Sequence, residues 1–123
     1  MDELLKLIHV LRSPEGCEWD RAQTHESMKK CLEDETKEVS QAIDNKDDEN
    51  LCEELGDVLM QVLINCEIAS ERGAFDFGDV VQVVTDKLIR RHPHVFGNIP
   101  KPETKEEVLE LWKKIKQREK EVK

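Results

Sequence analysis

Hydrophobic positions along the chain recur at the spacing of amphipathic helices, and no segment alternates convincingly in the manner of a half-buried strand. The pattern predicts five helices, over residues 3–12, 24–44, 50–71, 76–92 and from 104 onward. Gly73 follows the third helix, and Thr104 with Glu107 has the spacing of a capping box before the last. We therefore expect an all-α fold, a helical bundle of about four to five helices.

The segments between these helices are interpreted as loops. A polar loop is expected through Trp19 and Asp20, Pro93 is expected to end the fourth helix, and Gly97 and Pro100 belong to a linker. The chain has 123 residues, which is the size of one domain, since domains usually run to ~100–150 residues. We expect residues 1–123 to form a single domain.

Composition and charge exclude several classes of protein. Charged residues make up 38% of the chain and aromatic residues 4%, which argues against a β-sandwich or barrel. The formal net charge of −9 disfavours duplex nucleic acid and anionic membranes as main partners. No apolar run reaches the ~20 residues of a membrane helix, and the start Met1-Asp2-Glu3 lacks the basic region of a secretory signal. The four cysteines form no C-x-x-C pair and are expected to be reduced, in a cytoplasmic protein.

Acidic residues interrupt the apolar stripes of the second and third helices. Glu35 falls in the middle of the stripe of the second helix, and Glu38 lies at its edge. On the third helix Glu54 is flanked by apolar residues, while Asp57 begins a polar strip that Gln61 continues. Each helix thus presents two acids at i, i+3, a spacing that places both side chains on one side.

Four carboxylates buried together repel one another and lose hydration, so they must be protonated, paired with basic residues or bound to a metal. Carboxylate oxygens select hard cations such as Mg²⁺, Mn²⁺ or Ca²⁺. The alternative is a solvated face whose acids pair with Lys and Arg. A di-iron site is disfavoured because no His follows a Glu by three residues, and His92 and His94 lack partner ligands for zinc.

A basic cluster closes the fourth predicted helix. Lys87, Arg90 and Arg91 lie in its last turns, where positive charge complements the helix dipole. Beside an acidic metal cluster the same side chains would instead bind phosphate, because guanidinium groups contact phosphate oxygens in pairs. Both interpretations remain open at the level of the sequence.

These motifs resemble the MazG-like nucleoside triphosphate pyrophosphohydrolases, whose pattern is E-E-x-x-E, a spacer and then E-x-x-D. The matching segments are D-E-T-K-E at 34–38 and E-L-G-D at 54–57, with similar blocks at 16–20, 23–25 and 86–97. Asp34 replaces the first Glu of the pattern, and Glu18 stands where a Pro is common. The resemblance spans roughly residues 4–116.

The resemblance implies an all-α enzyme that uses Mg²⁺, with Mn²⁺ as a substitute, to hydrolyse nucleoside triphosphates to monophosphate and pyrophosphate and so clear non-standard or excess nucleotides. It carries over the following roles: Glu35, Glu38, Glu54 and Asp57 as metal ligands; Asp34 and Glu53 as neighbours of those ligands; Lys87, Arg90, Arg91 and Trp112 as nucleotide contacts. Glu38 or Glu53 is expected to accept the proton of the attacking water. A helical interaction module with structural acidic clusters is the non-catalytic alternative.

Association into a homodimer or higher oligomer is also expected. The segment 50–71 has apolar residues over a wide arc that includes Leu63 and Ile64, more than one partner helix would cover. Exposed apolar patches of this kind are usually buried by association. The family resemblance, which implies helices paired between subunits, points the same way.

Overall fold

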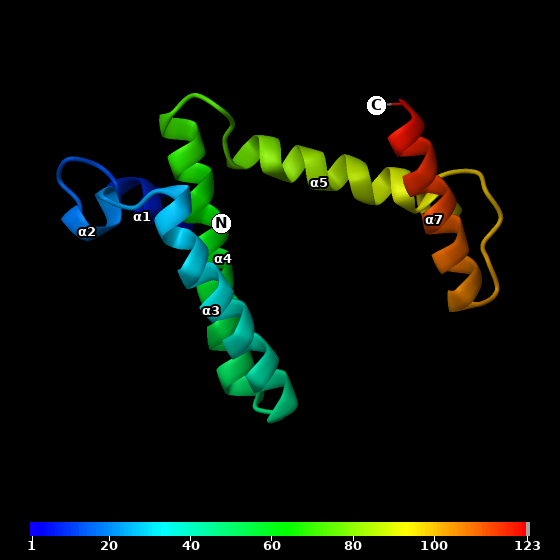
Figure 1. Cartoon of the computed structure of the whole chain (residues 1–123), viewed down its shortest axis with the longest axis horizontal. Coiled ribbons are helices and arrows are strands. Elements are labelled where there is room, and N and C mark those ends of the chain that lie inside the picture. The colour runs from blue at the N-terminus through cyan, green and yellow to red at the C-terminus, as the bar shows by residue number, and fades with distance from the viewer. Residues whose placement is uncertain (123) are drawn as a thin grey trace. The chain divides into compact units, whose positions relative to one another are not determined.

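The computed structural model describes residues 1–122, with side chains up to residue 121, and over these residues it contains helices and no strand. The helices are α1 (Asp2–Leu11), α2 (Glu18–Arg21), α3 (His25–Asp44), α4 (Asp48–Glu71), α5 (Phe77–Arg91), α6 (Pro93–Phe96) and α7 (Lys105–Val122). Figure 1 shows them in chain order. The all-α prediction is confirmed. No helix within residues 1–122 combines the length and apolar character needed to cross a membrane.

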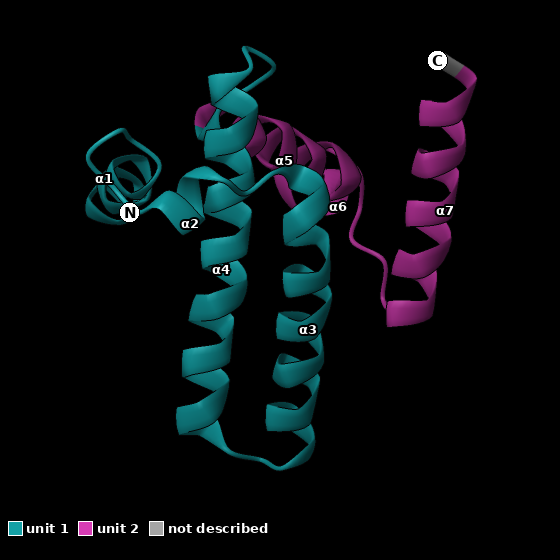
Figure 2. Ribbon diagram, turned by 60° about the vertical axis from the view of Figure 1, so that its left-hand side comes forward, with its two compact units in different colours: residues 1–77 teal, residues 78–123 magenta. Residues whose placement is uncertain are grey.

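The chain divides into two compact units, residues 1–77 and 78–123 (Figure 2). Unit 1 contains α1 to α4 and the first residue of α5. Unit 2 contains the rest of α5 together with α6 and α7.

Unit 1 is built on an antiparallel hairpin of α3 and α4, which lie side by side in Figures 1 and 2. At the start of α3 the hydroxyl of Thr24 accepts from the Ser27 amide and the hydroxyl of Ser27 accepts from the Thr24 amide, which forms a capping box. The Asp47 carboxylate accepts from the Asn50 amide at 3.1 Å and caps α4. These caps fix where each helix of the hairpin begins.

The core of unit 1 lies where α1 covers one end of this hairpin. Ile8 from α1, Met28 from α3, and Leu63, Ile64 and Ile68 from α4 form one buried cluster. Full burial of each such side chain stabilises the fold by about 1.5–3 kcal/mol. The sequence argument that Leu63 and Ile64 need a second subunit is therefore wrong, because both are buried within the single chain in the cluster that includes Ile8 and Met28.

Two one-turn helices, α2 and α6, replace expected loops. Pro93 does not simply end α5 but begins α6, because proline lacks the amide hydrogen that a first helical position leaves unbonded. The segment around α2, which contains Trp19, is anchored by Arg12, whose guanidinium donates to the Asp20 and Gln23 carbonyls. These contacts come from the residue that follows α1 and are absent from the helical spacing of the sequence.

In unit 2, α5 keeps the helical form that its valine spacing predicts. Val83, Val84 and Leu88 are 64%, 47% and 51% exposed in the single chain. The His92 ring, just beyond the end of α5, donates from Nδ1 to the Leu88 carbonyl at 2.7 Å. The same ring packs edge-on against Trp112 of α7, with ring centroids 5.3 Å apart.

Candidate functional site

The α3–α4 hairpin brings four carboxylates together. Glu35 and Glu38 project from α3, and Glu54 and Asp57 project from α4. One oxygen atom from each residue lies within 4.8 Å of those of the other three. The i, i+3 spacing on each helix produces this arrangement, since it places both acids of a pair on the face that meets the other helix.

Burial and mutual repulsion disfavour negative charge in this cluster. Loss of hydration is the largest cause that raises the pKa of Glu35, followed by the charges of Glu38 and Asp57. A hydrogen bond with Glu38 is the largest cause that raises the pKa of Glu54, to about 7, followed by burial and the charge of Glu38. Such a bond between two carboxyl groups requires a proton on one of them, so the cluster is not fully ionised near neutral pH.

The cluster has no internal counter-charge. Within the described part of the chain, no Lys, Arg or His forms an ion pair with any of the four acids. Glu35 Oε2 and Glu54 Oε2 are buried and accept no hydrogen bond from a donor. The interpretation of these acids as members of surface ion pairs is therefore wrong.

The donor set fits a hard divalent cation. Four carboxylates supply only oxygen ligands and up to four negative charges, the combination that Mg²⁺, Mn²⁺ and Ca²⁺ prefer. The two buried oxygens without donors, one on Glu35 and one on Glu54, have lone pairs available to a cation. The fit is specific to this class of ion, since the cluster contains no His or Cys ligand.

The two neighbouring acids lie outside the cluster. Asp34 is held by Lys30 at 2.9 Å, one turn earlier on α3. Glu53 is exposed on α4 and is not part of the group of four. Both adjoin a cluster residue in sequence, which leaves their expected roles as predictions.

A polar strip continues along α4 beyond the carboxylates, and it is more deeply buried at Gln61 than the sequence indicated. Gln61 is only 4% exposed, and its Oε1 has no hydrogen-bond donor. Asn65 Nδ2 donates to the Gln61 carbonyl, and its Oδ1 accepts from His25 Nδ1 at 2.8 Å. The signal in the sequence was the polar spacing after Asp57, but burial could not be inferred from it.

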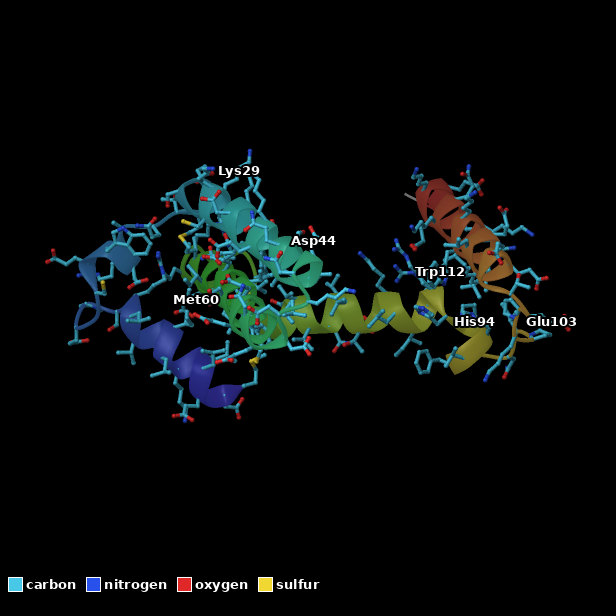
Figure 3. All side chains as sticks on the ribbon, turned by 90° about the horizontal axis from the view of Figure 1, so that it is seen from below. Lys29, Asp44, Met60, His94, Glu103 and Trp112 are labelled. Atoms are coloured by element: carbon cyan, nitrogen blue, oxygen red, sulfur yellow. The ribbon has the colours of Figure 1, made fainter. Side chains whose placement is uncertain are left out.

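A shallow groove adjoins this strip between α3 and α4. Its volume is ≈ 400 Å³, and it is lined by His25, Glu26, Met28, Lys29, Leu32 and Asn65. Leu32 precedes Glu35 by three residues, so the groove begins about one turn from the carboxylates along α3. Lys29, labelled in Figure 3, supplies positive charge to its rim.

The basic cluster lies in unit 2. Lys87 is half-buried on α5, while Arg90 and Arg91 both contact Glu119 of α7 at 3.3 Å and 3.1 Å. The two arginines are thus directed at a carboxylate and not at the last carbonyls of α5, one of which the ring of His92 binds. A role limited to the helix dipole does not explain this geometry.

Trp112 is half-buried beside the ring of His92. Its indole Nε1 and the Nδ1 of His94 are buried and have no hydrogen-bond partner within the described residues. Figure 3 labels both Trp112 and His94. The indole of Trp112 therefore has a donor that is free to bind a ligand. The expected contact between Trp112 and the nucleotide stays a prediction.

Comparison with known proteins agrees with the fold and identifies the family. The profile of the MazG nucleotide pyrophosphohydrolase domain matches residues 23–96. The nucleoside triphosphate pyrophosphohydrolase/pyrophosphatase MazG of Thermotoga maritima is 53% identical over 119 residues, covering 97% of this chain and 45% of that protein. The nucleoside triphosphate pyrophosphohydrolase of Escherichia coli K12 is 44% identical over 120 residues, covering 97% and 45%.

A solved structure has the same architecture. The crystal structure of a mazG-related protein from Thermotoga maritima matches with a TM-score of 0.77 at 30% identity, covering 95% of this chain and 99% of that one. The class is therefore an all-helical fold of the MazG-related type. Within that class, the chain belongs to the MazG nucleotide pyrophosphohydrolase domain family, and the resemblance drawn from the sequence is confirmed. The chain spans just under half the length of the two curated relatives described here.

Proposed function

We propose that this chain hydrolyses nucleoside triphosphates to nucleoside monophosphate and pyrophosphate with the help of Mg²⁺. The observation that carries the proposal is the cluster of four carboxylates, one oxygen from each within 4.8 Å, without any internal counter-charge. A protein gains nothing in stability from such a cluster unless a cation completes it. Membership of the family supports the same activity.

Glu35, Glu38, Glu54 and Asp57 would hold the ion, with Mn²⁺ as a substitute. When bound, Mg²⁺ supplies positive charge that draws anionic phosphate to an acidic protein and favours ionisation of a water molecule. The four side chains come from two capped, packed helices, so their positions are set before any ligand arrives.

The reaction adds water across the bond between the α- and β-phosphates. The water oxygen forms a bond to the α-phosphorus, the bridging oxygen leaves with pyrophosphate, and a carboxylate takes the water's proton. Glu38 and Glu53 are the two candidates for that carboxylate. Glu38 is the exposed member of the cluster. Glu53 is also exposed and lies outside the cluster, next to Glu54 in the sequence.

The remaining roles concern binding of the substrate. Lys87, Arg90 and Arg91 bind its phosphates, and Trp112 contacts the nucleotide through its free indole donor. Asp34, paired with Lys30, orients groups around the metal ligands. The nucleoside occupies the groove between α3 and α4, whose lining includes both polar side chains and the apolar Met28 and Leu32. We assign no preference of base or sugar.

We also propose that the chain acts as one domain, residues 1–123, within a homodimer in the cytoplasm, and that it removes non-standard or excess nucleotides. Support for association comes from apolar side chains left exposed in the single chain. Leu55 and Val62 of α4 are 51% and 37% exposed, and Val84 and Leu88 of α5 are 47% and 51% exposed. Association buries such surface.

The site of bond cleavage provides the test. Hydrolysis in ¹⁸O-labelled water is expected to place the label in the nucleoside monophosphate, observed as an isotope shift of its ³¹P resonance. Label in pyrophosphate would indicate attack at the β-phosphorus, and release of orthophosphate would indicate a phosphatase. Either result would contradict the proposed reaction.

A further inference from the structure

The arginine pair of unit 2 already binds an anion, and that anion belongs to the chain itself. Arg91 donates from Nε to Glu119 Oε1 at 3.1 Å and from Nη2 to Oε2 at 3.5 Å. Arg90 donates from Nη2 to the same two oxygens at 3.4 Å and 3.3 Å. Two guanidinium groups therefore converge on two oxygens that share one central atom.

This arrangement has the form in which guanidinium groups bind phosphate. A phosphate also offers several oxygens on one central atom, and paired N–H donors of arginine match it. The Glu119 carboxylate is 20% exposed, while Arg90 remains 50% exposed. An incoming anion can therefore reach the arginines from solvent without any prior opening of the unit.

We propose that Glu119 is an internal substitute for phosphate, which occupies the Arg90–Arg91 pair until a polyphosphate displaces it. The inference rests on the proposed function, in which these arginines bind the phosphates of the substrate. Glu119 then sets a threshold for binding: the affinity of the pair for any phosphate is multiplied by the fraction of time that the pair is free of Glu119. Weakly bound anions fail to displace it, and a highly charged tripolyphosphate group succeeds.

The charges around Glu119 agree with this role. The hydrogen bonds from Arg91 and then Arg90 are the largest causes that lower the pKa of Glu119, which keeps it ionised and in competition with phosphate. By contrast, Glu110 on the same helix pairs only with Lys113, at 3.4 Å, and both side chains are well exposed. Glu110 therefore serves as a matched control on α7.

The experiment measures binding of inorganic tripolyphosphate to the full chain without divalent metal. Glu119→Gln keeps the shape of the side chain and removes its charge, so the variant is expected to bind tripolyphosphate about five- to tenfold more tightly than the unaltered chain. Glu110→Gln is expected to bind as the unaltered chain does. Unchanged or weaker binding by Glu119→Gln would overturn the inference, as would absence of tripolyphosphate binding to both chains.

A second measurement covers the case in which Glu119→Gln disturbs the packing of α7 against α5. In the unaltered chain, saturating tripolyphosphate is expected to shift the ¹³C resonance of the Glu119 carboxyl group and raise its pKa toward the ordinary value. A resonance that stays in place would show that Glu119 is never displaced, and would overturn the inference.

Hydrolysis of nucleotides is assayed separately, so the two proposals can fail independently. If the unaltered chain hydrolyses nucleotides but Glu119→Gln binds tripolyphosphate no more tightly, the inference is contradicted and the proposed function stands. If Glu119→Gln binds tripolyphosphate more tightly but the unaltered chain hydrolyses no nucleotide, the proposed function is contradicted and the role of Glu119 stands.

Discussion

Glu38 and Glu54 meet across the α3–α4 hairpin with one oxygen of each within 4.8 Å of the other, and interaction with Glu38 raises the pKa of Glu54 to about 7. The two residues are 16 positions apart in the sequence (54 − 38), yet the antiparallel hairpin makes them neighbours. Their contact places two acids together, and among the described residues neither forms an ion pair with a basic side chain. The free chain is therefore less stable than it would be with neutral groups in these positions.

Glu35→Gln and Glu38→Gln are each expected to abolish Mg²⁺-dependent hydrolysis without loss of the fold. The neutral amide relieves repulsion, so the metal-free variants should be as stable as the parent or more stable. Their free energy of unfolding should exceed that of the parent by at most about 1 kcal/mol. Urea titration followed by circular dichroism measures this. Glu33→Gln, an exposed change on the same helix, should leave activity and stability unaltered. Full turnover in both cluster variants would contradict the metal-site assignment.

Arg91→Ala is expected to lower kcat/KM by about ten- to a hundredfold, because a hydrogen bond to a charged group contributes about 1.5–3 kcal/mol. The affinity of the free protein for Mg²⁺ should not change, since Arg91 is not among the carboxylates that bind it. Steady-state kinetics and calorimetric Mg²⁺ titration separate the two effects. Arg118→Ala, an exposed change on α7, is the control. Normal kinetics with lowered thermal stability would restrict Arg91 to a structural role.

The ion pair of Arg12 and Glu71, at 2.7 Å, predicts a pH dependence of stability. The hydrogen bond from Arg12 lowers the pKa of Glu71 below its ordinary value of 4.5. The pair therefore stabilises the fold at pH above that value, and the contribution is lost as pH falls through the lower pKa of the folded state. Glu71 is 42% exposed, so we expect only about 0.5–1 kcal/mol.

The measurement compares the parent with Glu71→Gln by urea unfolding between neutral and acidic pH. The difference in the free energy of unfolding should be constant near neutral pH and shrink as the pH falls below the ordinary Glu71 pKa of 4.5, until it disappears once Glu71 is protonated in the folded state. Glu110→Gln, which removes an exposed partner of Lys113, should show no such difference. If the free energies of unfolding of the parent and Glu71→Gln still differ in acid, the stabilising role of the ionised Arg12–Glu71 pair is contradicted.

The sequence predicted the helices and the carboxylate centre well, because both depend on local spacing. Glu35 and Glu54 were recognisable as acids within apolar stripes, and their helices made them neighbours once the hairpin formed. The one-turn helices α2 and α6 were missed, since each depends on contacts or on a proline position that a helical period does not reveal.

Contacts between distant segments were beyond the reach of the sequence. Glu119 reads as one more charge in a Lys/Glu-rich tail, and only the folding of α7 against α5 brings it to Arg91. Burial of Leu63 and Ile64 by the first helix was an alternative to burial by a second subunit, and the sequence could not decide between them because the short first helix gave no sign of which surface it would cover. Periodicity indicates which face of a helix is apolar but not what covers it.

The chain is expected to be a two-fold dimer at micromolar concentration, because exposed apolar side chains such as Leu88, at 51%, gain stability when covered. Light scattering coupled to gel filtration should give about twice the chain mass of 14.3 kDa. The value should be independent of concentration over a tenfold dilution. A particle of single-chain mass with full activity would contradict the dimer.

Quantitative analysis of products with and without Mg²⁺ tests the central claim most directly. A panel of ribo- and deoxyribonucleoside triphosphates is incubated with the full chain, and both monophosphate and pyrophosphate are measured. The account predicts equal amounts of the two products from at least one nucleotide, no reaction with a chelator present, and recovery on addition of Mg²⁺. It predicts no reaction by Glu35→Gln and normal reaction by Glu33→Gln. Failure of every nucleotide to yield pyrophosphate, or hydrolysis that persists in chelator, would contradict it.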